Sequence, residues 1–197
     1  MAKRSADKKT RPGRLRIVAG NWRSRLLEIE DAPGLRPTSE RIRETLFSWL
    51  APQLTGARCL DLFAGSGALG LEALSRGAAS CVFVENSARV VTALRKNIAA
   101  LDAGGADVRE IDAIEYLKGV DDVEFDVVFL DPPFATDLYA DLCRLLVERP
   151  LLAESARIYI EEGRSTPATV LPEGWQILRT KNAGNVRYSL VNSGNKA

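Results

Sequence analysis

Histidine is absent from this 197-residue sequence. Imidazole changes charge near neutral pH and is a common zinc ligand, so its absence excludes imidazole acid–base chemistry and histidine-bound metals. The three cysteines, Cys59, Cys81 and Cys143, lie far apart and lack the C-x-x-C spacing of zinc and redox sites. We therefore expect three buried, reduced thiols in a cytoplasmic protein that holds no metal.

Long apolar segments are also missing. No run of apolar residues is long enough to span a bilayer, and the basic N-terminus is not followed by the apolar stretch of a signal peptide. We therefore expect no membrane association.

The positive charge is unevenly placed. The chain has a formal net charge of +1, yet residues 1–25 contain nine Lys or Arg against one Asp, which leaves −7 on the remainder. Residues 1–13 have few large apolar side chains, so we expect a disordered basic tail. A basic arm on an acidic body indicates a polyanionic partner, although a merely solubilising tail would have the same composition.

A glycine turn stands at the centre of the sequence, in LDLFAGSGALGLE from Leu60 to Glu72. An apolar run, a turn and a second apolar run predict a strand, a loop and a helix. Gly65, Gly67 and Gly70 match G-x-G-x-x-G, in which backbone N–H groups at the helix start face a ligand. A P-loop is excluded because no Lys-Ser or Lys-Thr follows the glycines.

Two cofactor classes fit this turn, the nicotinamide dinucleotides and S-adenosylmethionine. Glu85 lies at the distance expected for an acid that binds ribose hydroxyls in either class. Asp61 comes just before the turn, which is typical of S-adenosylmethionine enzymes. The chain is also short for a dehydrogenase with a second catalytic domain.

Apolar runs and helical periodicities alternate from residue 57 onward. This pattern predicts an α/β fold with a mostly parallel sheet covered on both faces. We expect a first strand that runs through Leu60, and further strands at 81–85, 108–111, 125–130 and 157–161. A closing hairpin is expected at 175–180 and 186–192. Together these make seven strands in a core of residues 51–197.

The segment 14–50 precedes this core, and we expect 14–197 to form one compact unit. Residues 14–30 predict a small hairpin with Trp22 near its tip, followed by a helix that Thr38 or Ser39 caps and Pro52 stops. Arginines beside an aromatic can contact phosphates and stack on a base. The RNA-binding candidates are Arg14, Arg16, Trp22, Arg23, Arg25, Arg36 and Arg41. Alternatively, Trp22 caps the hairpin, and Arg36, Arg41 and Arg43 are ordinary surface charges.

Four acids stand at or near the carboxyl ends of successive predicted strands, namely Asp61, Glu85, Asp112 and Asp131. The carboxyl ends of parallel strands meet at one edge of a sheet, where ligands bind in open α/β folds. We therefore expect these four carboxylates to converge on one site.

The motif Asp131-Pro132-Pro133-Phe134 predicts the chemistry of that site. The prolines fix the Asp131 carboxylate and the Pro132 carbonyl as two acceptors, which match the two donors of a planar NH₂ group. Phe134 can stack on the base that carries the amine. A sulfonium cofactor could then transfer its methyl group to the nitrogen. DNA adenine or cytosine amines and protein glutamine amides remain alternative targets. The other alternative is that the chain is an RNA-binding protein without enzymatic activity.

These motifs together resemble the RsmD family of bacterial 16S ribosomal RNA guanine N2-methyltransferases. The resemblance rests on RPTSERIRETLFSWL (36–50), LDLFAGSGALGLEALSRGA (60–78), VFVE (82–85), LDPPF (130–134) and GNVRY (184–188). It implies a Rossmann-like methyltransferase fold and a cofactor, S-adenosylmethionine, that is converted to S-adenosylhomocysteine. It also implies that the protein is a monomer and that its partner is 16S rRNA in the small ribosomal subunit. Ser24 stands where the family often has a glycine.

The resemblance also implies roles for individual residues. The cofactor residues would be Asp61, Phe63, Ala64, Gly65, Ser66, Gly67, Glu85, Asn86, Asp112 and Ala113. Within that set, Asp61 and the glycine turn would hold the methionine part, Glu85 the ribose and Asp112 the adenine amine. Asp131, Pro132, Pro133 and Phe134 would form the catalytic motif that holds the target guanine.

Overall fold

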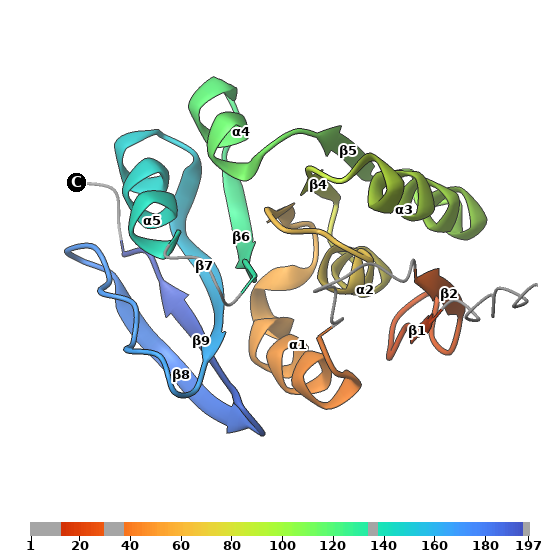
Figure 1. Ribbon diagram of the computed structural model, residues 1–197, viewed down its shortest axis with the longest axis horizontal. Coiled ribbons are helices and arrows are strands. Elements are labelled where there is room, and N and C mark those ends of the chain that lie inside the picture. The colour runs from red at the N-terminus through yellow and green to blue at the C-terminus, as the bar shows by residue number, and fades with distance from the viewer. Residues whose placement is uncertain (1–12, 30–37, 134–137, 195–197) are drawn as a thin grey trace, which may run out of the picture.

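Strands and helices alternate along the chain in the computed structural model, which describes residues 13–29, 38–133 and 138–194 (Figure 1). The helices are α1 (Glu40–Leu54), α2 (Ala68–Ser75), α3 (Ala88–Leu101), α4 (Ala113–Gly119) and α5 (Tyr139–Glu148). The strands are β1 (Gly13–Arg16), β2 (Leu26–Ile29), β3 (Arg58–Asp61), β4 (Ser80–Glu85), β5 (Ala106–Glu110), β6 (Phe125–Leu130), β7 (Leu152–Gly163), β8 (Gln176–Ala183) and β9 (Val186–Asn192).

Seven of these strands form one sheet in the order β5-β4-β3-β6-β7-β9-β8. Strands β3 to β7 pair in parallel, whereas β9 is antiparallel to both β7 and β8. The chain order reverses at β3, which has β4 on one side and β6 on the other. Ligands of open α/β sheets bind at the carboxyl ends of the strands beside such a reversal.

Alternate residues of the central strands face opposite sides of the sheet. Cys59, Phe83 and Phe129 pack with α1, α2 and α3, whereas Leu60, Val84 and Leu130 pack with α4 and α5. Side chains in a strand alternate with a period of two, so a strand that is apolar throughout needs cover on both faces. The prediction of a mostly parallel sheet between two helical layers is confirmed.

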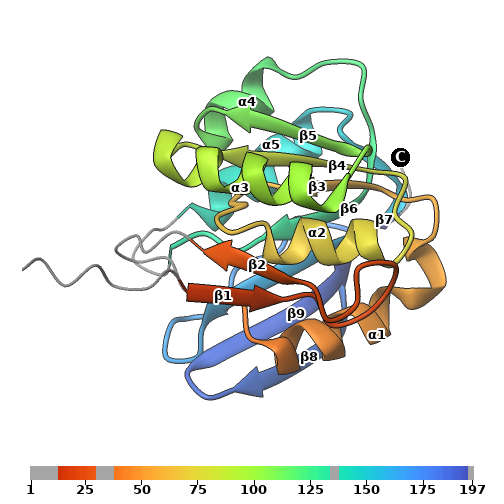
Figure 2. The same cartoon turned by 90° about the vertical axis from the view of Figure 1, so that its right-hand side faces the viewer.

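The N-terminal hairpin of β1 and β2 is a separate two-stranded sheet, with Gly13 paired to Ile29 and Arg16 to Leu26. Its inward side chains Leu15, Ile17 and Leu27 join the same core as α1, α2 and α3. Figure 2 shows the hairpin beside α2. The predicted boundary between residues 50 and 51 lies inside α1.

Two predicted element boundaries are wrong. Helix α1 continues through Pro52 to Leu54, because Pro52 lies on an exposed part of the last turn where one missing N–H costs little. Strand β7 runs from Leu152 to Gly163, well beyond the predicted 157–161, because it pairs with β6 on one side and β9 on the other.

All three cysteines are buried and unpaired, as predicted. Burial raises the pKa of the Cys59 and Cys81 thiols, which keeps both protonated. Within the described residues, helices of the length and apolar character needed to cross a bilayer do not occur.

Candidate active site

A cavity of about 1300 Å³ opens at the carboxyl ends of β3, β4, β6 and β7. Asp61, Glu85, Asp112 and Asp131 all line it. The sequence placed these acids at one sheet edge, and the structure brings them into one cavity. Each acid follows or ends a strand of the parallel sheet, so the topology alone determines their convergence.

Nine of the ten expected cofactor residues line this cavity. They are Asp61, Phe63, Ala64, Gly65, Ser66, Glu85, Asn86, Asp112 and Ala113. Gly67 is the exception. It begins α2 in the left-handed conformation with φ +79°, and a Cβ there would lie 2.5 Å from Leu94 Cδ1. The position therefore needs glycine for the backbone turn and for packing against α3, not for an open cavity wall.

Glu85 fixes the glycine turn. The Gly65 amide donates to Glu85 Oε2 at 3.0 Å, and the Ser87 amide donates to Glu85 Oε1 at 2.8 Å. Gly65 has φ +49°, a conformation that favours glycine. A carboxylate has about four acceptor sites, so each Glu85 oxygen can still accept a hydroxyl from a ligand.

Asp61 is a buried carboxyl at the inner wall. The Gly70 amide, in the first turn of α2, donates to Asp61 Oδ2 at 3.0 Å. Burial, with a contribution from the neighbouring Glu85 carboxylate, raises the pKa of Asp61 to about 7 against the opposing Gly70 hydrogen bond. Such a carboxyl favours a cationic partner, because a positive charge would restore its ionised form.

Asp112 and Ala113 form the outer wall. The Asp112 side chain caps α4 by accepting from the Ile114 amide at 2.8 Å and the Glu115 amide at 3.2 Å. Both bonds use Oδ1, so Oδ2 remains as an acceptor beside the cavity. Asp112 is exposed, in contrast to Asp61.

Asp131, Pro132 and Pro133 line the same cavity directly after β6, whereas Phe134 lies outside the described residues. The Thr38 hydroxyl donates to Asp131 Oδ2 at 3.3 Å. Burial, followed by the Glu161 and Asp61 carboxylates, raises the pKa of Asp131 well above its ordinary value, and the Thr38 hydrogen bond opposes this. The turn therefore presents a carboxyl whose ionisation depends on its immediate neighbours.

Thr38 and Glu161 are among the cavity residues that were not predicted as site residues. Thr38 was considered only as a helix cap. Glu161 is buried and lies beside Asp131, because Leu130 pairs with Ile160 in the parallel ladder of β6 and β7. The rule that selected the other four acids would have found Glu161, since it also stands near the carboxyl end of a strand.

Glu161 is held by two tyrosines. The Tyr159 hydroxyl donates to Glu161 Oε2 at 2.5 Å, and the Tyr139 hydroxyl donates to the Glu161 carbonyl oxygen. Burial raises the pKa of the Glu161 carboxyl. Asp131 and Glu161 thus form a pair of neighbouring acids in a poorly hydrated place, where their joint ionisation is disfavoured.

The RNA-binding candidates lie apart from the cavity wall. Arg14, Arg16, Arg23 and Arg25 are exposed on the hairpin and Arg41 on α1, whereas Arg36 lies outside the described residues. Trp22 is half-buried against the core, with its backbone N–H donating to Ser75 Oγ at 3.0 Å. Trp22 therefore packs against the core cluster that also contains the hairpin side chains Leu15 and Leu27.

Comparison with known proteins agrees with this geometry. The family model described as "Conserved hypothetical protein 95" matches residues 15–192. The chain is 47% identical to Ribosomal RNA small subunit methyltransferase D of Escherichia coli K12, over 90% of this chain and 89% of that protein. A solved structure of the Escherichia coli protein yhhF is 42% identical with a TM-score of 0.87, and the match covers 93% of this chain and 100% of that one.

A more distant structure shares the fold. An RNA methyltransferase from Salinibacter ruber, solved with S-adenosyl-L-homocysteine, is 18% identical with a TM-score of 0.63, covering 82% of this chain and 96% of that one. The fold is that of the Rossmann-like methyltransferases. Within this class the chain belongs to the RsmD family, as its close relatives and the family model show.

Proposed function

We propose that the chain transfers a methyl group from S-adenosylmethionine to the exocyclic N2 amine of a guanine in 16S rRNA of the small ribosomal subunit. The observation that carries this proposal is the shared cavity, in which the Asp131-Pro132-Pro133 turn lies with the glycine turn and its acids. The identity to the Escherichia coli enzyme over most of both chains supports the substrate class.

The residues present fit the cofactor. Asp61 supplies a buried negative charge for the methionine ammonium group, Glu85 acceptors for the ribose hydroxyls, and Asp112 an acceptor for the adenine amine. The volume of about 1300 Å³ leaves room for a nucleoside cofactor and for a flipped base. When bound, S-adenosylmethionine supplies an electrophilic methyl group on a positively charged sulfur.

The Asp131 turn acts on the target amine. The Asp131 carboxylate and the Pro132 carbonyl accept its two N–H groups, which orients the nitrogen lone pair toward the methyl carbon. S-adenosylmethionine held by Asp61, Glu85 and Asp112 would supply the methyl carbon to this nitrogen and would keep the electron pair of the broken carbon–sulfur bond as a neutral thioether. The nitrogen becomes acidic as it gains the methyl group, so its proton passes to the Asp131 carboxylate without an imidazole or a metal.

The exposed arginines of the hairpin support an RNA contact. Arg14, Arg16, Arg23 and Arg25 are exposed on the same hairpin as the half-buried Trp22, and together they offer positive charge to the phosphates and one aromatic face to a base. Arg36 and Arg41 extend this surface in our proposal. We further propose that residues 14–50 face the RNA, that residues 51–197 hold the cofactor, and that the protein acts as a cytoplasmic monomer.

One experiment tests the function directly. Small subunits that lack the modification are incubated with the protein and labelled S-adenosylmethionine, and mass spectrometry maps the methylated nucleotide. We expect one N2-methylguanine in 16S rRNA. Asp131→Asn should lose at least a hundredfold in turnover while keeping cofactor affinity, because the acceptor charge is gone.

The matched control is Asp141→Asn on α5, where an exposed Asp pairs with Arg144. This variant should retain wild-type turnover. Methylation of another nucleotide or of protein, or full turnover by Asp131→Asn, would contradict the proposal.

A further inference from the structure

Thr38 lies immediately before α1 and is buried, with 6% of its surface exposed. The next residue, Ser39, caps the helix by accepting from the Ile42 amide at 3.3 Å. Capping therefore does not occupy the Thr38 hydroxyl, which donates instead to Asp131 Oδ2 at 3.3 Å across 93 positions of sequence. Thr38 also lines the cavity.

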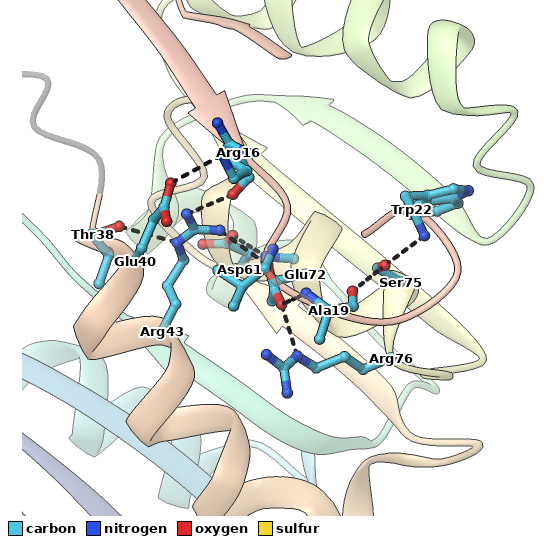
Figure 3. Close-up of polar contacts among 12 residues, drawn as sticks. Arg16, Ala19, Trp22, Thr38, Glu40, Arg43, Asp61, Glu72, Ser75 and Arg76 are labelled. Carbon is cyan, nitrogen blue, oxygen red and sulfur yellow. Dashed lines mark hydrogen bonds and ion pairs between the residues drawn. The ribbon is translucent and has the colours of Figure 1, made fainter. Parts of the chain in front are cut away.

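Arg43 holds Thr38 at this place from one turn further along α1 (Figure 3). Arg43 Nε donates to the Thr38 carbonyl oxygen at 3.1 Å, and Arg43 Nη2 donates to the Arg16 carbonyl oxygen at 2.8 Å. Its remaining nitrogen, Nη1, lies 3.0 Å from Glu72 Oε2. All three nitrogens of the guanidinium group are thus occupied, and its rigid plane fixes the backbone of Thr38 between the hairpin and α2.

We propose that Thr38 is a positioning residue, which orients the Asp131 carboxylate so that Oδ2 is occupied and Oδ1 faces the target amine, and that Arg43 fixes Thr38 for this role. The inference rests on the proposed function, because it assumes that Asp131 accepts the amine. A carboxylate free to rotate would present either oxygen at variable angles, whereas one anchored oxygen fixes the plane of the group.

The hydroxyl also favours the ionised form of Asp131. The charged and titratable groups around Asp131 are Glu161 and Tyr159 on β7, Asp61 on β3 and Tyr139 on α5. Burial, and after it the carboxylates of Glu161 and Asp61, raise the pKa of Asp131, and the Thr38 hydrogen bond lowers it. A protonated Asp131 would offer a donor where the amine needs an acceptor, so loss of the hydroxyl would reduce the reactive fraction.

The test compares Thr38→Val, which has nearly the same shape without the hydroxyl, with Thr38→Ser, which keeps the donor. Steady-state methylation of unmodified small subunits is measured between pH 5.5 and 9. We expect Thr38→Val to lower kcat about tenfold to a hundredfold, which is the range for a hydrogen bond to a charged group. Its KM for S-adenosylmethionine should stay within about twofold of wild type, since only Asp131 is affected.

The acidic limb of the pH profile distinguishes positioning from folding. Thr38→Val should move this limb to higher pH, because Asp131 then ionises less readily. Thr38→Ser should restore both kcat and the limb. The control Thr45→Val removes a hydroxyl that donates to the Arg41 carbonyl oxygen on the same helix, and it should change neither quantity.

A double variant separates this inference from the proposed function. If Thr38 acts through Asp131, Thr38→Val combined with Asp131→Asn should be no slower than Asp131→Asn alone. If Asp131→Asn is inactive but Thr38→Val keeps the wild-type kcat and pH profile, only the role of Thr38 is overturned. Full turnover by Asp131→Asn would overturn the role of Asp131, and this inference with it.

Discussion

Arg43 and Glu72 form an ion pair inside the protein, with 3.0 Å between Nη1 and Oε2 and side-chain exposures of 1% and 0%. Glu72 also accepts the backbone amides of Val18 at 2.8 Å and Ala19 at 3.0 Å, and Arg76 Nε at 2.7 Å. Two helices and the N-terminal hairpin are therefore tied to a single carboxylate (Figure 3). The pair compensates for its own dehydration through these additional hydrogen bonds.

Removing one partner of this pair should destabilise the fold strongly. Arg43→Met leaves Glu72 buried with Arg76 as its remaining cation, and we expect the free energy of unfolding to fall by about 3–5 kcal/mol. The matched control is Arg41→Met, on the exposed face of the same helix, which should change stability by less than about 0.5 kcal/mol. Urea denaturation measures both. Equal losses in the two variants would contradict a special role for the buried pair.

Asp61 should make stability and cofactor binding depend on pH in opposite directions. Its pKa is about 7 in the folded protein, against an ordinary value of 3.8, so the folded state binds the proton more tightly than the unfolded state. The contribution of Asp61 to the free energy of unfolding is thus full below about pH 4 and is lost as pH rises through 7.

Asp61→Asn removes this dependence. The melting temperature of Asp61→Asn minus that of wild type should be larger at pH 8 than at pH 5. Thermal unfolding of both proteins at the two pH values measures this difference. Calorimetry should find that wild type binds S-adenosylmethionine more tightly at pH 8 than at pH 6, and that Asp61→Asn loses affinity at pH 8. A pH-independent wild-type affinity would exclude Asp61 as the partner of the ammonium group.

Ser24 adopts a conformation that favours glycine. Its φ is +66°, and its amide donates to the Ile17 carbonyl oxygen at 2.8 Å, which closes the hairpin. The left-handed conformation costs a residue with a side chain about 1–2 kcal/mol, and part of this is regained against the greater freedom of glycine in the unfolded chain. Ser24→Gly should therefore stabilise the protein by roughly 0.5–1 kcal/mol in urea denaturation. Ser24→Ala, which keeps a Cβ, should bring no such gain.

The hairpin arginines should account for much of the salt dependence of RNA binding. Each arginine that neutralises a phosphate adds about one to the slope of log affinity against log salt concentration. Arg14→Ala combined with Arg23→Ala should weaken binding and reduce this slope by about two. Filter binding between roughly 50 and 300 mM salt measures the slope, because screening of exposed charges changes strongly over this range. Arg144→Ala on α5, away from the hairpin in Figure 1, should leave the slope unchanged. A slope unaffected by the double variant would remove the hairpin from the RNA-binding surface.

The cavity acids could be predicted because their positions follow from the topology of a parallel sheet. Apolar runs show where strands end, and the carboxyl ends of parallel strands share one edge, so Asp61, Glu85, Asp112 and Asp131 had to converge. The glycine motif also selects Gly67, and in the structure a Cβ at this position would collide with Leu94. A glycine required by a neighbouring helix and a glycine required by a ligand look alike in sequence.

Sequence alone determined the order of strands and helices, the glycine turn and the acids at the sheet edge, because each depends on local periodicity or on a fixed rule of connection. Tertiary structure decided the roles of Thr38, Arg43 and Glu161. Arg43 read as a surface charge on an exposed helix start, and only its contacts with Glu72 and two backbone carbonyls show that it is buried. Such contacts join segments far apart in the chain, so no local pattern records them. The physical reason is that burial of a charge depends on partners that only the folded chain brings within hydrogen-bonding distance.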